Sequence, residues 1–476
     1  MGDTISADIC IIGAGSGGLS VAAGAAQLGR KVVLIEKHKM GGDCLNTGCV
    51  PSKSLLAAGK AAQTIRTAGR FGVNGHEPEI DFAKVHDHVH GVIAAIAPVD
   101  SVERFEGLGA RVIQAAARFV DGGTVETDKG HRVKARWFVI ATGSRAAAPP
   151  IPGLDAVPYL TNESIFERKA APGHLVIIGG GPIGLEMAQA HRRLGARVTV
   201  LERGAIMPKD DPELVAVVRK ALLAEGVELV EGADIARVEP SGNGLAVVLR
   251  DAGGERRVEG TDLLVAAGRR PNVEGLGLEA AGVAYDAKGL KVDARLRTSN
   301  PRIYAVGDIA GGPQFTHIAG YHAGIVIRNI LFWLSPAKVD YTALPWVTYT
   351  DPELAHVGMT EAQARETHAD VTVARWHLHE NDRAQAERDI HGFAKVVLRR
   401  NGTILGASIV GPHAGELIQP WALAISNGLK IKAFTKMIAP YPTLGEVNKR
   451  AAGAFYTPSL FSDRTRKIVD LLARFR

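Results

Sequence analysis

Cysteine, aromatic residues and long apolar runs are all scarce in this chain of 476 residues. Its three cysteines, Cys10, Cys44 and Cys49, cannot build the disulfide framework of a small secreted domain. No uninterrupted apolar run is long enough to span a bilayer, and the apolar stretch 9–26 is glycine-rich and follows acidic residues, unlike a signal peptide. We therefore expect a cytoplasmic protein without a membrane partner.

Strong charge of one sign is also missing. The 56 Lys and Arg residues exceed the 50 Asp and Glu residues by only six, which argues against a nucleic-acid partner. Glycine, in contrast, is abundant, with 55 residues. Such a chain is long enough for about three domains, and its composition favours an α/β enzyme with many tight turns.

Two segments repeat one pattern: an apolar strand, the spacing G-x-G-x-x-G, a helix, and a second strand that ends in Glu. The interval from the first Gly to the Glu is 23 residues in both copies. This is the fingerprint of a dinucleotide-binding βαβ unit, so we expect two bound dinucleotides. The expected contacts are Gly13, Gly15, Gly18 and Glu36 in the first copy and Gly179, Gly181, Gly184 and Glu202 in the second.

Between the repeats lies a second motif, Gly41–Lys53, which contains Cys44 and Cys49. Two close cysteines in a cysteine-poor chain indicate redox catalysis or metal binding. Zinc needs about four ligands, and Cys10 lies within an expected strand, where it is better explained as a small buried hydrophobe. We therefore favour catalysis over metal binding for this pair. The histidine groups 86–90 and 377–379 are interpreted as surface residues, and no metal site is expected.

Gly41–Lys53 closely resembles the redox-active motif of the class I pyridine nucleotide–disulfide oxidoreductases, such as dihydrolipoamide dehydrogenase, glutathione reductase and mercuric reductase. The resemblance covers essentially the whole chain and includes the segment 141–144 and the pair Gly307 and Asp308. It implies an α/β fold with two Rossmann-like dinucleotide-binding domains and a C-terminal α+β dimerisation domain. The implied parts are an FAD-binding domain (1–150), an NAD(P)-binding domain (151–272), a return to the FAD-binding domain (273–340) and an interface domain (341–476).

The same resemblance implies a role for each motif. The first fingerprint would hold the ADP half of FAD, and the second would hold the nicotinamide nucleotide. Cys49 would lie beside the flavin, Cys44 would attack the substrate, and Lys53 would approach the flavin and pair with Glu186. The other implied cofactor contacts are Lys37, Gly42, Asp43, Thr142, Gly143, Ser144, Arg203, Gly268 and Asp308. The active site would be completed across a homodimer.

The second fingerprint also bears on the choice of nucleotide. The carboxylate of Glu202 favours NADH, because it repels the 2′-phosphate of NADPH. Arg203 follows it and could accept that phosphate, although a solvated surface position explains this arginine equally well. NADH is therefore the favoured nucleotide, with NADPH as the alternative.

The sequence departs from the family pattern near its C-terminus. Disulfide reductases of the family carry His-Pro-x-x-x-Glu there; this chain keeps Glu446 but has Tyr441 in the histidine position. A tyrosine, with a reference pKa of about 10, is a poor general base near neutral pH. Mercuric reductases share this tyrosine but end in a cysteine pair, which the segment 473–476 lacks.

The expected acceptor is therefore a soft metal ion of the mercuric type or a disulfide, carried by a small molecule or a small protein. Dihydrolipoamide dehydrogenase-like turnover is an alternative, as is a diaphorase or quinone reductase that uses the flavin directly. The intact cysteine pair argues against direct use of the flavin, and Lys53 and Glu186 argue against a non-catalytic subunit. His317 is interpreted as packing near the flavin, and the apolar positions within 468–475 predict a helix that packs on protein.

Overall fold

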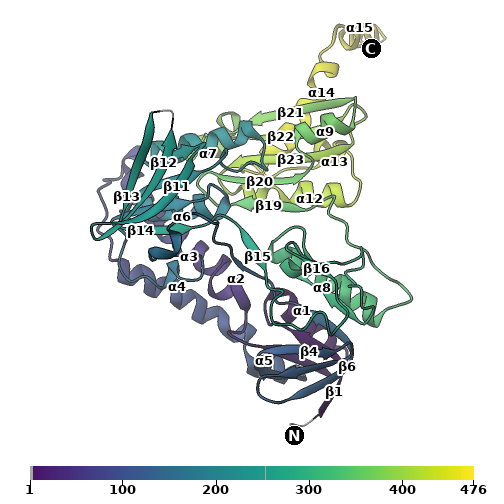
Figure 1. Ribbon diagram of the computed structural model, residues 1–476. Helices are drawn as coiled ribbons and strands as arrows, with labels where there is room; N and C mark the ends of the chain where they lie inside the picture. The colour runs from purple at the N-terminus through teal and green to yellow at the C-terminus, as the bar shows by residue number, and fades with distance from the viewer. Residues whose placement is uncertain (1–3, 252, 476) are drawn as a thin grey trace. The chain divides into compact units, whose positions relative to one another are not determined.

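The computed structural model describes residues 4–251 and 253–475, and the chain divides into two compact units (Figure 1). The first unit takes in the chain up to Ala58, Glu79–Gly179 and Ile235–Val339. The second takes in Gly59–Pro78, Gly180–Asp234 and the chain from Asp340 onward. The α/β fold class is confirmed, whereas the four-part domain division stays a prediction.

The main sheet of the first unit has the order β3-β2-β1-β6-β5-β4, with β18 beside β6. The neighbours β3, β2, β1, β6 and β18 are parallel, whereas β4 and β5 are antiparallel additions. The strands are β1 (Thr4–Ile12), β2 (Val32–Glu36), β3 (Ala110–Gln114), β4 (Ala117–Asp121), β5 (Thr124–Thr127), β6 (Arg132–Ile140) and β18 (Ile303–Ala305).

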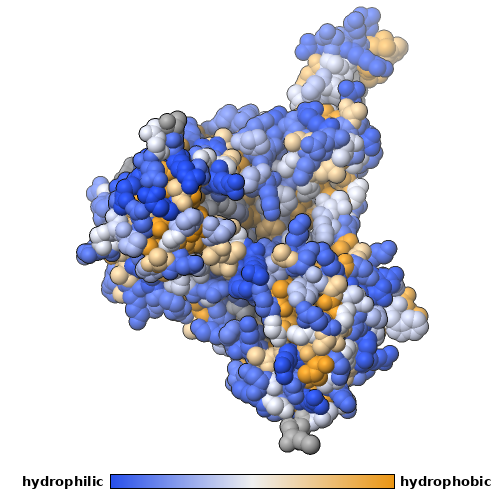
Figure 2. Space-filling model, in the orientation of Figure 1, coloured by the Kyte–Doolittle hydropathy of each residue, from blue (hydrophilic) through white to orange (hydrophobic). Residues whose placement is uncertain are grey.

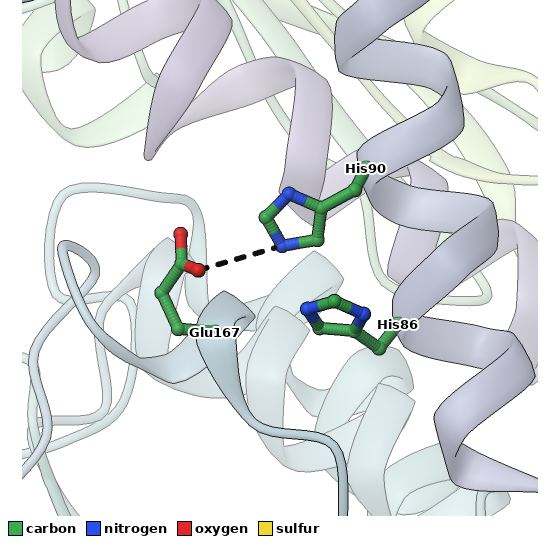
Figure 3. Close-up of side chains that lie close together, drawn as sticks. All are labelled: His86, His90 and Glu167. Atoms are coloured by element: carbon green, nitrogen blue, oxygen red, sulfur yellow. Dashed lines mark ion pairs between the residues drawn. The ribbon is translucent and has the colours of Figure 1, made fainter.

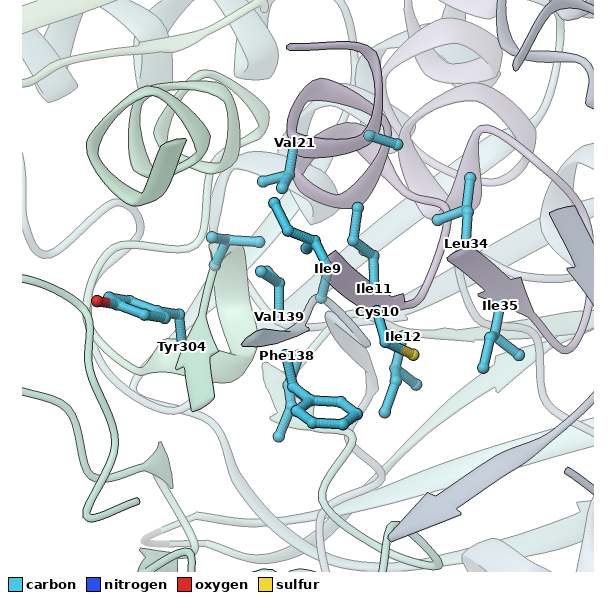
Figure 4. Close-up of a cluster of buried hydrophobic side chains, with 14 of the residues drawn as sticks. Ile9, Cys10, Ile11, Ile12, Val21, Leu34, Ile35, Phe138, Val139 and Tyr304 are labelled. Carbon is cyan, nitrogen blue, oxygen red and sulfur yellow. The ribbon is translucent and has the colours of Figure 1, made fainter. Parts of the chain in front are cut away.

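The core of this unit lies on the parallel strands (Figure 4). The end of β1 is apolar on both faces because helices or other strands cover both, as parallel sheets require. Cys10 is one of these side chains, fully buried among Ile9, Ile11 and Phe138. Burial raises the pKa of its thiol, so Cys10 is held as an inert thiol.

Helices α1 and α8 pack against each other beside this sheet. The helices that begin in this unit are α1 (Ser16–Gln27), α2 (Gly42–Asn46), α3 (Cys49–Thr67), α4 (Phe82–Ile96), α5 (Val102–Gly107) and α8 (Thr316–Leu331). The short 3-10 helices are η2 (Ala97–Asp100), η3 (Leu154–Ala156), η4 (Ile165–Glu167) and η5 (Gly307–Ala310).

Smaller sheets complete the first unit. They are the parallel pair β8 (His174–Ile178) and β14 (Asp262–Val265), the antiparallel pair β7 (Ser144–Ala146) and β15 (Arg269–Pro271), the antiparallel pair β16 (Tyr285–Asp286) and β17 (Gly289–Leu290), and the sheet of β11 (Asp234–Ser241), β12 (Gly244–Asp251) and β13 (Gly254–Gly260).

The second unit holds the rest of the second fingerprint and an antiparallel sheet in the order β19-β20-β23-β22-β21. Its strands are β9 (Arg197–Glu202), β10 (Glu228–Glu231), β19 (Pro345–Thr348), β20 (Glu353–Gly358), β21 (Val371–His377), β22 (Phe393–Arg399) and β23 (Ile404–Gly411). Its helices are η1 (Ala68–Phe71), α6 (Pro182–Arg193), α7 (Pro212–Ala224), α9 (Glu361–Thr367), η6 (Leu378–Glu380), α10 (Asp382–Ala386), α11 (Ala414–Leu417), α12 (Gln419–Ser426), α13 (Lys432–Lys436), α14 (Glu446–Leu460) and α15 (Asp463–Ala473).

The last helix, α15, differs from the sequence-based expectation. Apolar side chains do recur at helical spacing, but none of its residues is buried within Asp463–Ala473, which the structure describes in full. Figure 2 shows apolar groups on its surface, and Phe475 just beyond it is 82% exposed. The predicted packing on protein is therefore wrong for contacts within one chain. Among the described residues, no helix has the length and apolarity that a membrane crossing requires.

A buried cation joins α7 and α9 to the antiparallel sheet. The side chain of Lys395 on β22 is 2% exposed. Its Nζ lies 2.6 Å from Asp211, 2.8 Å from Glu361 and 3.0 Å from Glu213. A buried charge is tolerated only when paired in this way, so the lysine and its three carboxylates depend on one another.

Replacing this lysine tests that dependence. We expect Lys395→Met to lower the free energy of unfolding by about 3–5 kcal/mol, because the buried carboxylate of Asp211 then loses its cation, whereas Glu213 and Glu361 keep Arg375. Urea denaturation followed by circular dichroism measures the change. Lys430→Met, at an exposed position, is the matched control. Equal midpoints for the two variants would show that the cluster contributes nothing to stability.

Candidate active site

The turn between β1 and α1 is too tight for side chains at two of its glycines. Gly13 has φ +106°, and a Cβ there would collide with the carbonyl of Ala141. A Cβ at Gly18 would overlap the carbonyl of Gly13. Gly15 caps α1 without a side-chain hydrogen bond, so the N-terminal N–H groups of the helix are left for an anion such as a pyrophosphate.

A carboxylate at the end of β2 is fixed beside this turn. Glu36 accepts hydrogen bonds from the backbone N–H of Ala14 at 2.6 Å and of His38 at 2.8 Å. Each carboxylate oxygen has two acceptor sites, so both can also accept a hydroxyl. The glycine cradle and this oriented carboxylate together fit the pyrophosphate and ribose of an adenosine dinucleotide.

The second fingerprint repeats this geometry. Gly181 caps α6 with φ −77° and ψ −179°, close to the −82° and −177° of Gly15. Glu202 accepts from the backbone N–H of Gly180 at 2.6 Å and of Gly204 at 2.9 Å, as Glu36 does in the first copy. The two sequence repeats therefore form the same pattern of hydrogen bonds. The second repeat offers a second site that suits a nucleotide.

The two redox cysteines lie on consecutive helices. Cys44 is on α2, whose start is a turn with positive φ at Gly41 and Gly42, and Cys49 is the first residue of α3. The sulfur of Cys49 lies 3.3 Å from the hydroxyl of Thr316 at the start of α8. Three segments therefore meet at the sulfur atoms.

The surroundings of the pair place the negative charge on one sulfur. A hydrogen bond from the Cys44 thiol, another from Thr316 and the charge of Lys53 lower the pKa of Cys49 to about 6, against the opposing effects of burial and Asp43. The hydrogen bond with Cys49, together with burial, raises the pKa of Cys44. The N-terminus of α3 adds positive potential at Cys49. In the dithiol state Cys49 is the thiolate and Cys44 the proton donor to it.

Arg269 is a further part of the site that the sequence analysis did not single out, although it follows Gly268 in a segment expected to contact the cofactors. Its guanidinium donates to the hydroxyl of Ser144 at 2.7 Å and to Asp43 at 3.0 Å. It also lies 3.7 Å from Asp308. One partly exposed cation thus joins residues from three separate motifs.

The Gly307–Asp308 turn is held by two partners. Ser144 donates from its hydroxyl to the Asp308 carboxylate, whose pKa is raised by burial. His322 on α8 accepts from the backbone N–H of Gly307 at 3.1 Å, and burial lowers the pKa of His322 to about 4. The imidazole is therefore neutral and acts as an acceptor at neutral pH.

Two asparagines connect the redox segment and the 141–144 motif to other loops. Asn162 donates to the carboxylate of Asp43 at 2.9 Å and to the carbonyl of Thr47 at 3.1 Å. Asn272 donates to the carbonyl of Thr142 at 2.8 Å, and its backbone carbonyl accepts from the Thr142 hydroxyl. The sequence did not predict a role for either asparagine, because no sequence motif marks a residue whose role is to hold a loop by hydrogen bonds.

Lys53 and Glu186 belong to different units. Lys53 is on α3 and acts on Cys49 through its charge. Glu186 is on α6, is 4% exposed, and accepts from the backbone N–H of Tyr349 at 2.9 Å. The family-implied pairing of the two side chains stays a prediction.

Tyr441 and Glu446, expected to complete the site, lie in the second unit. Tyr441 is 68% exposed, and its hydroxyl donates to Asp382 at 2.8 Å. That hydrogen bond raises the pKa of Tyr441, so even less phenolate is present to act as a base at neutral pH. Glu446 is the first residue of α14 and is partly exposed.

The remaining residues singled out in the sequence are on the surface or in turns. Gly143 and Gly268 adopt positive φ. The ring of His317 stacks on Phe315, with centroids 5.2 Å apart. Exposed positions are found for Lys37, Arg203, His317, His377 and His379.

Comparison with known proteins agrees with this geometry. Residues 7–323 match the family model described as pyridine nucleotide-disulphide oxidoreductase, and residues 344–452 match its dimerisation domain. A mercuric reductase from Streptomyces lividans is 37% identical over 455 residues, covering 94% of this chain and 96% of the relative. A dihydrolipoyl dehydrogenase from Geobacillus stearothermophilus is 36% identical over 461 residues, covering 94% and 96%.

A solved structure is similar over nearly the whole chain. The HOCl-induced flavoprotein disulfide reductase RclA from Escherichia coli superposes with a TM-score of 0.84 at 27% identity, covering 96% of this chain and 100% of RclA. The dimerisation domain supports a homodimer. The chain therefore belongs to the pyridine nucleotide-disulphide oxidoreductase family and is an FAD-dependent NAD(P)H oxidoreductase with a disulfide redox centre.

Proposed function

We propose that this enzyme uses NADH to reduce a soft metal ion of the mercuric type, which is bound as substrate by Cys44 and Cys49. FAD supplies the two-electron carrier chemistry between the nicotinamide and the sulfur atoms. The net reaction is balanced: NADH and Hg²⁺ give NAD⁺, elemental mercury and one proton. The mercuric reductases among the relatives support this choice of acceptor.

Tyr441 is the observation that carries the choice. Turnover of a dithiol or disulfide needs a base that moves a proton to and from the attacking thiol near neutral pH. Tyr441 is held protonated by Asp382, so it cannot take that role, and its hydroxyl can donate to a thiolate only after it leaves Asp382. A metal ion needs no general base that shuttles a proton to and from the thiol, because it binds the thiolate directly and the single proton of Cys44 is released to solvent.

The unequal charge of the two cysteines also supports a soft metal ion as the acceptor. With Cys49 ionised and Cys44 its hydrogen-bond donor, a soft cation arriving at Cys44 replaces a single proton. Arg269 keeps Asp43 paired, so that carboxylate does not compete for the cation. The two cysteines can therefore bind one metal ion with the loss of a single proton.

The dimer and the location are part of the proposal. We place Tyr441 of the partner subunit and Glu446 of the partner subunit next to the cysteine pair, because Tyr441 is largely exposed in the single chain. We also place the enzyme in the cytoplasm, where reducing conditions suit a catalytic disulfide.

The first prediction addresses the acceptor. Cys44→Ser should lower NADH-dependent Hg(II) reduction more than about 100-fold, because one of two thiolate ligands is lost, while NADH-dependent quinone reduction stays within about twofold. Mercury vapour release and NADH oxidation at 340 nm are the measurements. Ser54→Ala on α3 is the control.

Two outcomes would redirect this proposal. Full Hg(II) reduction by Cys44→Ser would mean that the flavin serves the acceptor directly. Faster turnover of lipoamide than of Hg(II) by the unmodified enzyme would make it a disulfide reductase. In that case Tyr441→His should raise lipoamide turnover further, because it restores a general base.

The second prediction concerns the thiolate. In the reduced enzyme, the long-wavelength charge-transfer absorbance of Cys49 next to oxidised flavin should be present above about pH 6 and lost below it. Thr316→Val removes a hydrogen bond to the thiolate and should raise the midpoint by about one pH unit, whereas Thr316→Ser keeps it. An unchanged midpoint in Thr316→Val would show that Thr316 does not stabilise the thiolate.

The third prediction concerns the nucleotide. Glu202→Gln should raise kcat/KM for NADPH relative to NADH about tenfold or more, because the charge that repels the 2′-phosphate is gone. Steady-state kinetics with both nucleotides give the ratio, and Glu255→Gln on an exposed strand is the control. If the unmodified enzyme prefers NADPH and Arg203→Ala abolishes that preference, the proposed use of NADH is wrong.

A further inference from the structure

A group of metal-ligating side chains lies on α4 and η4, apart from the cysteine pair. His86 and His90 are one helical turn apart on α4, and Glu167 ends η4 (Figure 3). One ligand atom from each residue lies within 4.8 Å of the other two. The sequence showed the two histidines on one helix face but no acid partner. The fold supplies that acid from a distant segment.

The two histidines face the same small volume. Their ring centroids are 4.2 Å apart, and the Nε2 atom of His90 lies 3.7 Å from the carboxylate of Glu167 (Figure 3). Histidines four residues apart on a helix are a recurrent way to hold a transition metal. For metal–ligand bonds of about 2.0–2.2 Å, tetrahedral ligands are roughly 3.4 Å apart, so small side-chain rotations close the site.

The surroundings of the site favour a cation. Asp87 lies 3.1 Å from Nδ1 of His86, which orients that ring and leaves its Nε2 atom as the metal ligand. The next basic residue along the chain, Arg168, is paired with Asp262 at 2.6 Å, so it does not neutralise Glu167. The carboxylates of Glu167 and Asp87 therefore supply negative charge suited to a divalent ion.

The backbone around the ligands is firmly held. Val89 on α4 is buried beside the histidines, and Ile165 and Phe166 of η4 are buried next to Glu167. The side chain of His86 is largely buried at 11% exposure, whereas those of His90 and Glu167 are 33% and 56% exposed. The site therefore combines fixed supporting segments with an open approach from solvent.

We propose that His86, His90 and Glu167 bind a divalent transition-metal ion, with water in the remaining position. Two imidazoles and one carboxylate suit Zn²⁺, Cu²⁺ or Ni²⁺ rather than Mg²⁺ or Ca²⁺, which prefer oxygen ligands. The ion would join α4 to η4. Asn162, shortly before η4, bonds to Asp43 and Thr47, so the joined segment also supports the loop between the two redox cysteines.

One of the two histidines also makes a hydrogen bond that needs no metal ion. His90 Nε2 also lies 3.2 Å from the carbonyl of Phe166, a hydrogen bond that by itself holds α4 to η4. His86 and Glu167 take no part in that bond. Their substitution separates a metal site from simple packing.

Zinc binding to the FAD-loaded protein tests the proposal. The parent is the Cys44→Ser, Cys49→Ser double variant, in which the redox thiols cannot bind zinc. Titration against a chromogenic chelator should show one Zn²⁺ per chain, and X-ray absorption should show nitrogen and oxygen ligands. His86→Ala and Glu167→Gln should each weaken binding at least about tenfold, whereas His88→Ala, at an exposed position on the same helix, should leave it unchanged.

Thermal unfolding gives a second readout. Zn²⁺ should raise the Tm of the parent and of His88→Ala but not of Glu167→Gln, because only an intact site binds the folded state preferentially. Glu167→Gln replaces a half-exposed side chain, so its Tm without metal should equal that of the parent. The proposal fails if the parent binds no Zn²⁺, or if His86→Ala and Glu167→Gln bind it as tightly as the parent does.

Discussion

The close approach of backbone to backbone at the first glycine turn is the constraint on which the rest of the site depends. Gly13 and Gly18 have no room for a Cβ, so β1 can pass into α1 without a spacer and the start of α1 stays open to an anion. The same tight passage brings Ala14 within hydrogen-bond distance of Glu36. The second fingerprint repeats the lack of room for a Cβ at Gly179 and the hydrogen bond to its glutamate, Glu202, so one local geometry occurs twice in the chain.

The redox centre depends on an unequal division of charge between two like residues. The two thiols have the same intrinsic chemistry. Cys49, however, is the first residue of a long helix, and the charge of Lys53 lowers its pKa. Cys44 lies within a short helix. The positions of the two cysteines in the fold therefore decide which sulfur donates the hydrogen bond and which sulfur accepts it. Asp43, which is paired with Arg269, opposes this division because its charge raises the pKa of Cys49.

Local spacing made the nucleotide sites and the cysteine pair predictable, because each is set by residues within about 25 positions of one another. The supporting residues were not predictable in this way. Arg269 reaches Asp43 across 226 positions, and Thr316 reaches Cys49 across 267. The acid near His86 and His90 was missed for the same reason. Helix α15 had the right periodicity, but periodicity does not say whether the packing partner belongs to the same chain.

The long separation between Cys49 and Thr316 has a consequence for synthesis. At roughly 5–20 residues per second, the 267 residues between the two take about 13–53 seconds to be made. Through that interval the nascent chain already displays both redox cysteines, whereas the hydroxyl that stabilises the thiolate does not yet exist. The pair therefore gains this hydrogen bond only when about two thirds of the chain has been made, once most of the first unit is available to enclose it.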